Sequence, residues 1–273
     1  MTAAEILRHR LQNQRLRPGR PGTPADVVRW LGAVQAQDYA GSLWALGLRT
    51  GRGTDADVER AVRAKEIVRT WPMRGTLHFV PAESARWMLD LLTPRIVTRT
   101  AATRRRRTAC SVSVPGRESS IRSCCSKNGC RAAPRLRVTR PWVPSRSAIF
   151  PVTVPRGQTH TAALILLPAF DEYMVGYADR EAALGDARRI RPITPAEALS
   201  PLILRDGRAV GTWKRFPDKD GVSVAPGFFA APTRKDLDAF ERAAHLYGRF
   251  LGLPVTVSEY LSGNMKREHG GRT

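Results

Sequence analysis

The chain has 273 residues, of which 45 are Lys or Arg and 24 are Asp or Glu, and its formal net charge is +21. This length allows one large domain or two smaller ones, and the positive charge favours a polyanionic partner, nucleic acid ahead of an anionic membrane surface. No apolar run approaches the ~20 residues that cross a bilayer, and residues 1–17 contain no hydrophobic segment of the secretory kind. We therefore expect a cytoplasmic, nucleoid-associated protein without a membrane partner.

The first part of the chain predicts helices. Thr23-Pro24-Ala25-Asp26 combines a capping hydroxyl, a proline at the first helical position and an acid in the first turn, which together favour a helix start. The apolar stripe of this helix runs into Gln35-Ala36-Gln37-Asp38. Thr54, followed by Asp55, Asp57 and Glu59, predicts a second helix start.

A two-stranded hairpin is predicted next. Residues 67–71 and 76–80 are short extended runs, and Pro72-Met73-Arg74-Gly75 joins them; a helix then starts at residues 81–83. Two helices followed by a basic-tipped hairpin is the order of a winged-helix unit, in which one helix enters a DNA groove and the wing contacts the backbone. Five cations would supply phosphate contacts, although each alone is also typical of a solvated helix face: Arg60, Arg63, Lys65, Arg69 and Arg74.

Residues 101–160 differ in composition from the rest of the chain. They hold 13 Lys or Arg against the single acid Glu118, all four cysteines, eight serines and six prolines, with neither a helical nor a strand period. Three interpretations stay open: a disordered basic linker that binds nucleic acid, a metal site, or a stretch translated in a shifted reading frame. The cysteines form no C-x-x-C pair and no His pair lies near them, so the metal site is the least favoured.

The C-terminal part predicts a small antiparallel sheet closed by a helix. Residues 163–169 are a buried strand candidate, and residues 202–213 form two strands around Asp206-Gly207, a strong hairpin signal. Another strand is expected at residues 222–224. Thr233 then caps a helix that ends near Gly252.

The predicted fold class is therefore α+β. We expect a winged-helix (helix-turn-helix) module over residues 1–100 and a β-hairpin-rich domain over 161–255, with the basic segment 101–160 between them and a tail over 256–273. No phosphate loop or dinucleotide-binding motif occurs, and the histidines and cysteines show no metal-ligand spacing. We expect neither a cofactor nor a metal. The oligomeric state stays open, with a monomer as the expectation.

Three sequence blocks occur in a specific order: Val34-Gln35-Ala36-Gln37-Asp38, then residues 69–78, then residues 166–173 with Gly176-Tyr177 and Asp179-Arg180. Together they resemble the AlkZ-type DNA glycosylases, bacterial proteins that release alkylated bases and unhook interstrand crosslinks. The resemblance covers about residues 1–100 and 160–255. It implies tandem winged helices in a C shape, with a β-rich part completing a channel for duplex DNA that carries alkylated or crosslinked purines.

The resemblance also implies where this chain departs from the family. Members are longer by something like a further domain. Where they would have a second winged helix and most of a third, this chain has residues 101–160. The DNA channel built from several modules would then be incomplete.

The resemblance assigns catalysis to Gln35 and Gln37. An N-alkylated purine is already cationic and leaves readily, so a neutral amide that holds water against the developing oxocarbenium ion can suffice. On an ideal helix residues i and i+2 lie about 200° apart, so both amides face one cleft only if the helix ends or distorts there. Asp38 is the rival base, because a carboxylate is the stronger base. Our hypothesis is that Gln37 positions the water, Gln35 assists and Asp38 is structural.

The other two blocks supply further candidates. Thr76 and His78 would contact DNA beside Arg74, although a lone histidine is more often structural. Asp171 and Glu172, on a strand, would point to opposite faces; we expect one to face the channel or contact residues 69–78 and the other to lie on the surface, with Tyr173 in the channel or structural. Two alternatives to a glycosylase remain, a non-catalytic winged-helix DNA-binding protein and an inactive relative that lacks its middle part.

Overall fold

The computed structural model describes residues 1–17, 22–73, 75–110 and 163–258. Of the described residues, those in 1–100 and 163–258 belong to one compact unit. The helices of the described residues are α1 (Ala3–Asn13), α2 (Pro24–Leu31), α3 (Tyr39–Thr50), α4 (Asp55–Arg63), α5 (Ala82–Cys110), α6 (Glu172–Val175), α7 (Glu181–Ile190) and α8 (Arg234–Leu251). The strands are β1 (Val34–Gln35), β2 (Ile67–Met73), β3 (Thr76–Pro81), β4 (Leu164–Leu167), β5 (Leu202–Arg205), β6 (Arg208–Pro217), β7 (Val222–Phe228) and β8 (Val255–Val257).

The first three strands form an antiparallel sheet in the order β1-β3-β2. The hairpin of β2 and β3 confirms the one predicted, and Gln35 pairs with His78 across β1 and β3. We had expected the glutamine pair to lie at the end of the helix that starts at Pro24, and the structure corrects this expectation. Helix α2 stops at Leu31, where Gly32 takes a φ of 79° that continues no helix.

Helix α3 is the main element that the sequence analysis missed. The residues after the glutamine pair were expected to end a helix, but Asp38 begins one: its side chain accepts a hydrogen bond from the Gly41 N–H at 3.1 Å. An aspartate at this position is a preferred helix cap. The observed order is therefore helix α2, strand β1, helices α3 and α4, and then the hairpin of β2 and β3.

The second sheet has the order β4-β5-β6-β7-β8. Its hairpin turn at Asp206-Gly207 has φ angles of 49° and 83°, as a two-residue turn of the predicted kind requires. Strand β7 runs longer than expected. The edge strand β8, which was not predicted, pairs parallel to β7, so the sheet is mixed where we expected it to be antiparallel throughout.

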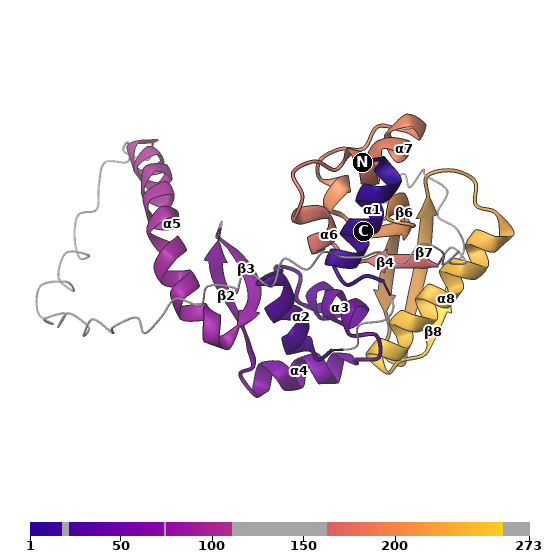
Figure 1. The fold of residues 1–273 in the computed structure, drawn as a ribbon, viewed down its shortest axis with the longest axis horizontal. Coiled ribbons are helices and arrows are strands. Elements are labelled where there is room, and N and C mark those ends of the chain that lie inside the picture. The colour runs from indigo at the N-terminus through magenta and orange to yellow at the C-terminus, as the bar shows by residue number, and fades with distance from the viewer. Residues whose placement is uncertain (18–21, 74, 111–162, 259–273) are drawn as a thin grey trace, which may run out of the picture. The chain divides into compact units, whose positions relative to one another are not determined.

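Both faces of this sheet are buried, because Ile203 lies in one apolar cluster while its neighbours Leu202 and Leu204 lie in another. Helix α8 covers the first face, running along the strands as Figure 1 shows, and α1 and α7 cover the second. The first cluster also contains buried side chains of α2, α3, α4 and β3. The N-terminal helices therefore share one core with the C-terminal sheet.

Aromatic residues join the two parts in that core. Tyr247 of α8 packs edge-on against Trp44 of α3 and Trp213 of β6, with ring centroids 5.0 and 5.3 Å apart. Both indoles donate to carbonyl oxygens of β4, at 2.7 Å each. Gly47 allows the close approach of α3 to α8, since a Cβ there would lie 2.4 Å from the Phe250 ring.

Helix α5 continues to Cys110, ten residues into the segment that we expected to be aperiodic. Alanine and arginine are strong helix formers, so a helix can extend here without an apolar stripe. The rest of that segment, residues 111–160, and the tail from 259 lie outside the described residues.

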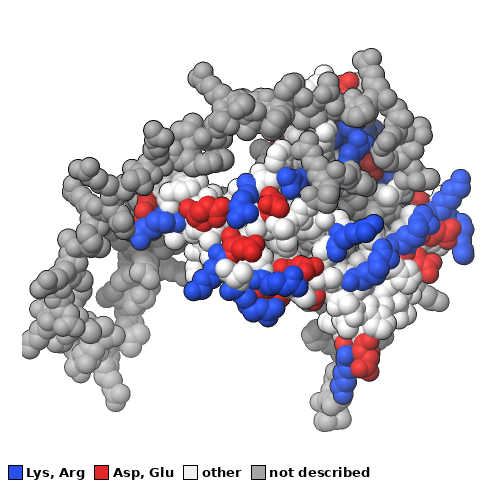
Figure 2. Space-filling view, turned by 60° about the horizontal axis from the view of Figure 1, so that its bottom comes forward, with Lys and Arg blue, Asp and Glu red and all other residues white. Residues whose placement is uncertain are grey.

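No helix within the described ranges is long and apolar enough to cross a membrane. Figure 2 shows Asp and Glu side chains beside Lys and Arg on the face in view.

Candidate active site

The two glutamines lie on the side of the chain that faces away from the core. Val34 and Ala36 are fully buried, whereas Gln35 is half-buried and Gln37 is exposed. The alternation of burial begins in strand β1 and continues to Gln37, which lies in a bend just before α3. In extended chain, residues i and i+2 share a side. The geometric difficulty of a helical glutamine pair therefore does not arise.

Three contacts hold the backbone of this segment. The Gln35 N–H donates to Glu172 Oε1 at 2.7 Å, and the Ala36 N–H donates to the Leu77 carbonyl oxygen at 2.8 Å. The Ala36 carbonyl oxygen accepts from both Nε and Nη2 of Arg69, at 3.0 and 2.9 Å. A carboxylate, a strand carbonyl and a guanidinium thus fix three consecutive peptide units.

Arg69 is held in turn by an aromatic ring. Its guanidinium lies 5.1 Å from the centroid of Tyr39, whose hydroxyl donates to Glu59 at 2.7 Å. Burial, followed by the hydrogen bond to Glu59, raises the pKa of Tyr39 to about 12, so this hydroxyl stays protonated at neutral pH. Arg69, which we expected to contact DNA, points its donors at the glutamine segment.

The two side-chain amides have different surroundings. The Gln37 carbonyl oxygen accepts a long hydrogen bond, 3.3 Å, from the Leu77 N–H, and its second lone pair remains for another donor. In the described part of the chain, no hydrogen bond involves the Gln35 side-chain amide. Each amide therefore keeps a carbonyl lone pair with which to hold a water molecule.

Asp38 has two partners besides solvent. It caps α3, and its Oδ2 lies 3.2 Å from Arg215 Nη2 on β6. Arg215 also donates to the Tyr247 hydroxyl at 3.1 Å. These contacts tie the Asp38 carboxylate to both α3 and β6.

The Asp171-Glu172-Tyr173 block begins helix α6 and does not lie on a strand, which corrects our expectation. Asp171 is buried and caps α6, where its side chain accepts a hydrogen bond from the Tyr173 N–H. It also forms a bidentate ion pair with Arg49, with distances of 2.7 and 2.8 Å. Glu172 is half-buried and reaches Gln35. Neither acid is a fully exposed surface residue. The Tyr173 hydroxyl donates to the Gly207 carbonyl oxygen in the β5–β6 turn at 2.8 Å.

The remaining predicted DNA-binding residues have varied positions. Arg60 and Arg63 are exposed on α4, and Arg60 pairs with Asp57 one turn away. Thr76 is half-buried on β3. His78 is only 1% exposed, with Nδ1 2.9 Å from the Thr76 carbonyl oxygen, so its side chain lies inside the protein. Arg74 lies outside the described residues.

Sequence reasoning missed three residues that shape the site, namely Arg49, Glu59 and Arg215. Arg49 carried a signal, because it follows the apolar run Leu43 to Leu48 on one helix, and a guanidinium in such a place needs a buried acid. Glu59 and Arg215 carried none, since their partners lie 20 and 177 residues away.

The described residues contain no group of three or more His, Cys, Asp or Glu side chains placed to hold a metal ion.

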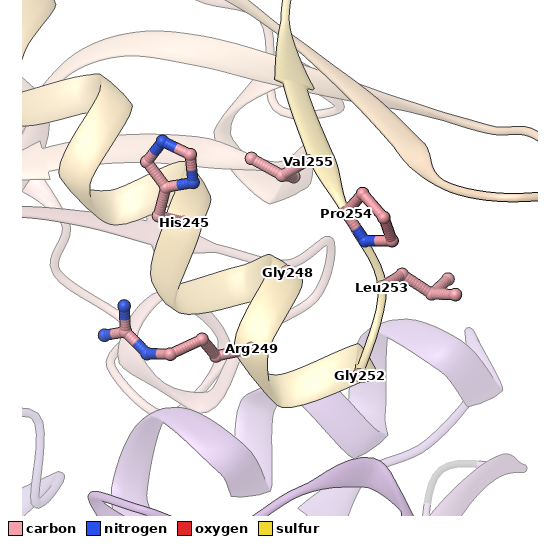
Figure 3. Close-up of a pocket in the computed structure, with 7 residues that line it drawn as sticks. All are labelled: His245, Gly248, Arg249, Gly252, Leu253, Pro254 and Val255. Atoms are coloured by element: carbon pink, nitrogen blue, oxygen red, sulfur yellow. The ribbon is translucent and has the colours of Figure 1, made fainter.

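A pocket of about 660 Å³ lies at the end of α8. Figure 3 shows His245 and Arg249 on the helix, and Leu253, Pro254 and Val255 on the chain that returns beside it. Its lining includes none of the candidate site residues.

A profile of the family described as "DNA glycosylase AlkZ-like" matches residues 28–119 and 131–250. The chain belongs to this family. The match contains all three sequence blocks on which the resemblance rested, and it confirms that resemblance. It also includes parts of the basic segment on either side of residues 120–130.

Two comparisons with Streptomyces sahachiroi proteins agree with membership of the AlkZ-like family. The chain is 33% identical over 88 residues to an interstrand DNA cross-link repair glycosylase, a match that covers 32% of this chain and 24% of that longer protein. The structure is similar to that of DNA glycosylase AlkZ, with a TM-score of 0.55 and 19% identity, covering 94% of this chain and 100% of the other. The second comparison establishes an AlkZ-like fold.

Proposed function

We propose that this chain is a DNA glycosylase that hydrolyses the N-glycosidic bond of alkylated or crosslinked purines in duplex DNA. Membership of the AlkZ-like family supports this reaction class. The observation that supports the site is the non-helical Gln35-Ala36-Gln37 segment, in which Ala36 is buried between two less buried glutamines and whose backbone is fixed by Glu172, Leu77 and Arg69.

In the proposed reaction, water forms a bond to the anomeric carbon while the bond from that carbon to the purine nitrogen breaks. The bonding electrons go to the purine, which neutralises the charge that alkylation gave it, and the water loses a proton to solvent. The carbonyl oxygen of Gln37 accepts a hydrogen bond from this water, and Gln35 assists. Asp38 is structural in this scheme, because its carboxylate caps α3 and pairs with Arg215.

We further propose that residues 24–81 form a winged helix. Helix α2, strand β1, helices α3 and α4, and the hairpin β2–β3 follow one another in the order of that module, with the sheet order β1-β3-β2. Helix α4, with exposed Arg60 and Arg63, would enter a DNA groove. Arg74, which lies in the sequence between β2 and β3 and outside the described residues, would contact the DNA backbone.

The test is single-turnover release of methylated purine from duplex DNA by the full-length chain and by Gln37→Ala and Gln35→Ala. We expect wild type to release base, and Gln37→Ala to lose at least about 100-fold in rate, in the range found when a positioning group is removed. Gln35→Ala should lose less. Asn13→Ala on α1 is a matched amide control, since Asn13 lies outside the segment, and it should match wild type.

Two outcomes would contradict the proposal. Salt-dependent duplex binding without base release by the wild type would instead support a non-catalytic DNA-binding protein. Base release that survives both glutamine substitutions would place the chemistry elsewhere in the chain.

A further inference from the structure

We propose that Glu172 is a positioning residue of the active site, and that its carboxylate orients Gln35 through the Gln35 backbone N–H. The inference rests on the proposed glycosylase function and deepens it. Both glutamines lie within residues 1–100. The carboxylate that binds the Gln35 N–H belongs to Glu172, 137 positions further along the chain.

The contact has the geometry of a strong hydrogen bond. The distance of 2.7 Å from the Gln35 nitrogen to Glu172 Oε1 is typical of charge-assisted bonds, which are shorter and stronger than neutral ones. Gln35 is an end residue of the two-residue strand β1, so its neighbouring sheet contacts are few. Strand β1 is an edge strand of its sheet, and the next N–H along the chain, that of Ala36, bonds to β3. Because successive N–H groups of a strand point to opposite sides, the Gln35 N–H points away from β3, and the carboxylate binds this edge donor.

Glu172 is itself held firmly by its neighbours. Asp171 forms the buried bidentate pair with Arg49, and the side chains of both partners have 0% exposure. The Tyr173 side chain is buried and hydrogen-bonded to Gly207 on the other side of Glu172. A short helix anchored on both sides of one residue leaves that residue little freedom to move, and it delivers the carboxylate to a fixed place.

A negative and a positive side chain bind different backbone groups of the glutamine segment. Glu172 holds the N–H of Gln35, and Arg69 holds the carbonyl oxygen of Ala36. Each charged group thus binds the backbone group of opposite polarity. Because small displacements of positioned groups lower rates by about 100-fold, losing one of these contacts should affect the rate of base release more than DNA affinity.

The experiment compares Glu172→Ala, which removes the acceptor, with Glu172→Gln, which keeps a carbonyl oxygen in the same place. Glu181→Ala is the control, since Glu181 is an exposed acid on α7 that pairs with Arg188. We expect Glu172→Ala to lower the single-turnover rate about 10- to 100-fold with an unchanged Kd for DNA. Glu172→Gln should recover most of that loss, and Glu181→Ala should match wild type.

Amide hydrogen exchange by NMR supplies a readout that does not need activity. In Glu172→Ala the Gln35 amide should exchange at least about tenfold faster than in wild type, while Glu172→Gln preserves its protection. The Ala36 amide, which bonds to the Leu77 carbonyl oxygen, reports the integrity of the sheet and should not change.

The two readouts separate the inference from the proposed function. If wild type releases no base, the glycosylase proposal fails, and hydrogen exchange alone decides whether Glu172 holds Gln35. Unchanged exchange at Gln35 in Glu172→Ala overturns the inference whatever the activity. Faster exchange together with a wild-type rate of base release, or a loss in Glu172→Gln as large as in Glu172→Ala, overturns the positioning role.

Discussion

Arg49 and Asp171 form a bidentate ion pair, with nitrogen to oxygen distances of 2.7 and 2.8 Å, at a place where both side chains are wholly buried. Arg49 also donates to the Gln14 and Ala45 carbonyl oxygens. Without the guanidinium, the Gln14 and Ala45 carbonyl oxygens would lose this donor, and Asp171 would be left as a buried charge.

We therefore expect Arg49→Met to lower the free energy of unfolding by about 3–5 kcal/mol, the range found when one partner of a buried pair is removed. Urea unfolding followed by circular dichroism measures it. Arg188→Met breaks an exposed pair with Glu181, and the expected loss is under about 1 kcal/mol. Equal losses in the two variants would show that breaking the buried pair costs no more stability than breaking an exposed one.

Gly47→Ala should destabilise the protein although it lies in a helix. Alanine normally favours a helix over glycine by about 1 kcal/mol, but here the added Cβ would lie 2.4 Å from the Phe250 ring, and overpacking of this kind costs about 1–3 kcal/mol. Gly185→Ala on α7 is the control, because its Cβ would meet only the flexible end of Glu181. A thermal melt should show a lower Tm for the first variant alone; a raised Tm for Gly47→Ala would contradict the close approach of α3 and α8.

Asp38→Asn should retain base release. Asparagine caps helices as well as aspartate does, and the lost pairing with Arg215 is partly exposed and worth at most about 1 kcal/mol. We expect the single-turnover rate to change by less than about fivefold. A collapse of the rate with an unchanged melt would instead make Asp38 the base.

DNA binding should depend on Arg60 and Arg63 through phosphate contacts. Each substitution to Gln should weaken binding to unrelated duplexes alike and reduce the slope of log K against log salt by about 1. Arg234→Gln on α8 serves as the control, since it carries the same charge change on a helix outside the proposed DNA-binding module. Fluorescence anisotropy at several salt concentrations checks this, and an unchanged slope would remove α4 from the interface.

Tyr39 predicts a loss of stability at alkaline pH. Its pKa is about 12 in the folded protein and about 10 in an unfolded chain. The neutral hydroxyl therefore stabilises the fold fully below pH 10, and this contribution is lost as pH rises towards 12. Tyr39→Phe should lose less stability over that interval than wild type does. Parallel slopes in urea unfolding at pH 9 to 11 would show that Tyr39 is not the titrating group.

Local signals in the sequence predicted much of the fold. Capping residues at Thr23, Thr54 and Thr233 each start a helix in the structure, and Asp206-Gly207 makes the predicted turn. The short strand β1 could not be found in this way, because two residues show no periodicity and their extended conformation depends on β3.

The candidate site was predictable in residue identity more than in geometry. The family blocks pointed to Gln35, Gln37 and Glu172, but the bond from Gln35 to Glu172 depends on tertiary structure. One of Asp171 and Glu172 was expected to face the channel or contact residues 69–78 and the other to lie on the surface, whereas Asp171 is buried and pairs with Arg49 of α3. Whether Arg60, Arg63, Thr76 and His78 contact DNA stays a prediction.

The packing of Trp44 against Tyr247 and Phe250 has a consequence for synthesis on the ribosome. At about 5–20 residues per second, α8 emerges roughly 10 to 40 s after α3. During that interval the Trp44 indole and the Gly47 backbone face solvent or a chaperone, and for the first part of it the glutamine segment also lacks Glu172. The nascent N-terminal part thus lacks contacts of the candidate site as well as part of its core, and α8 supplies that part of the core.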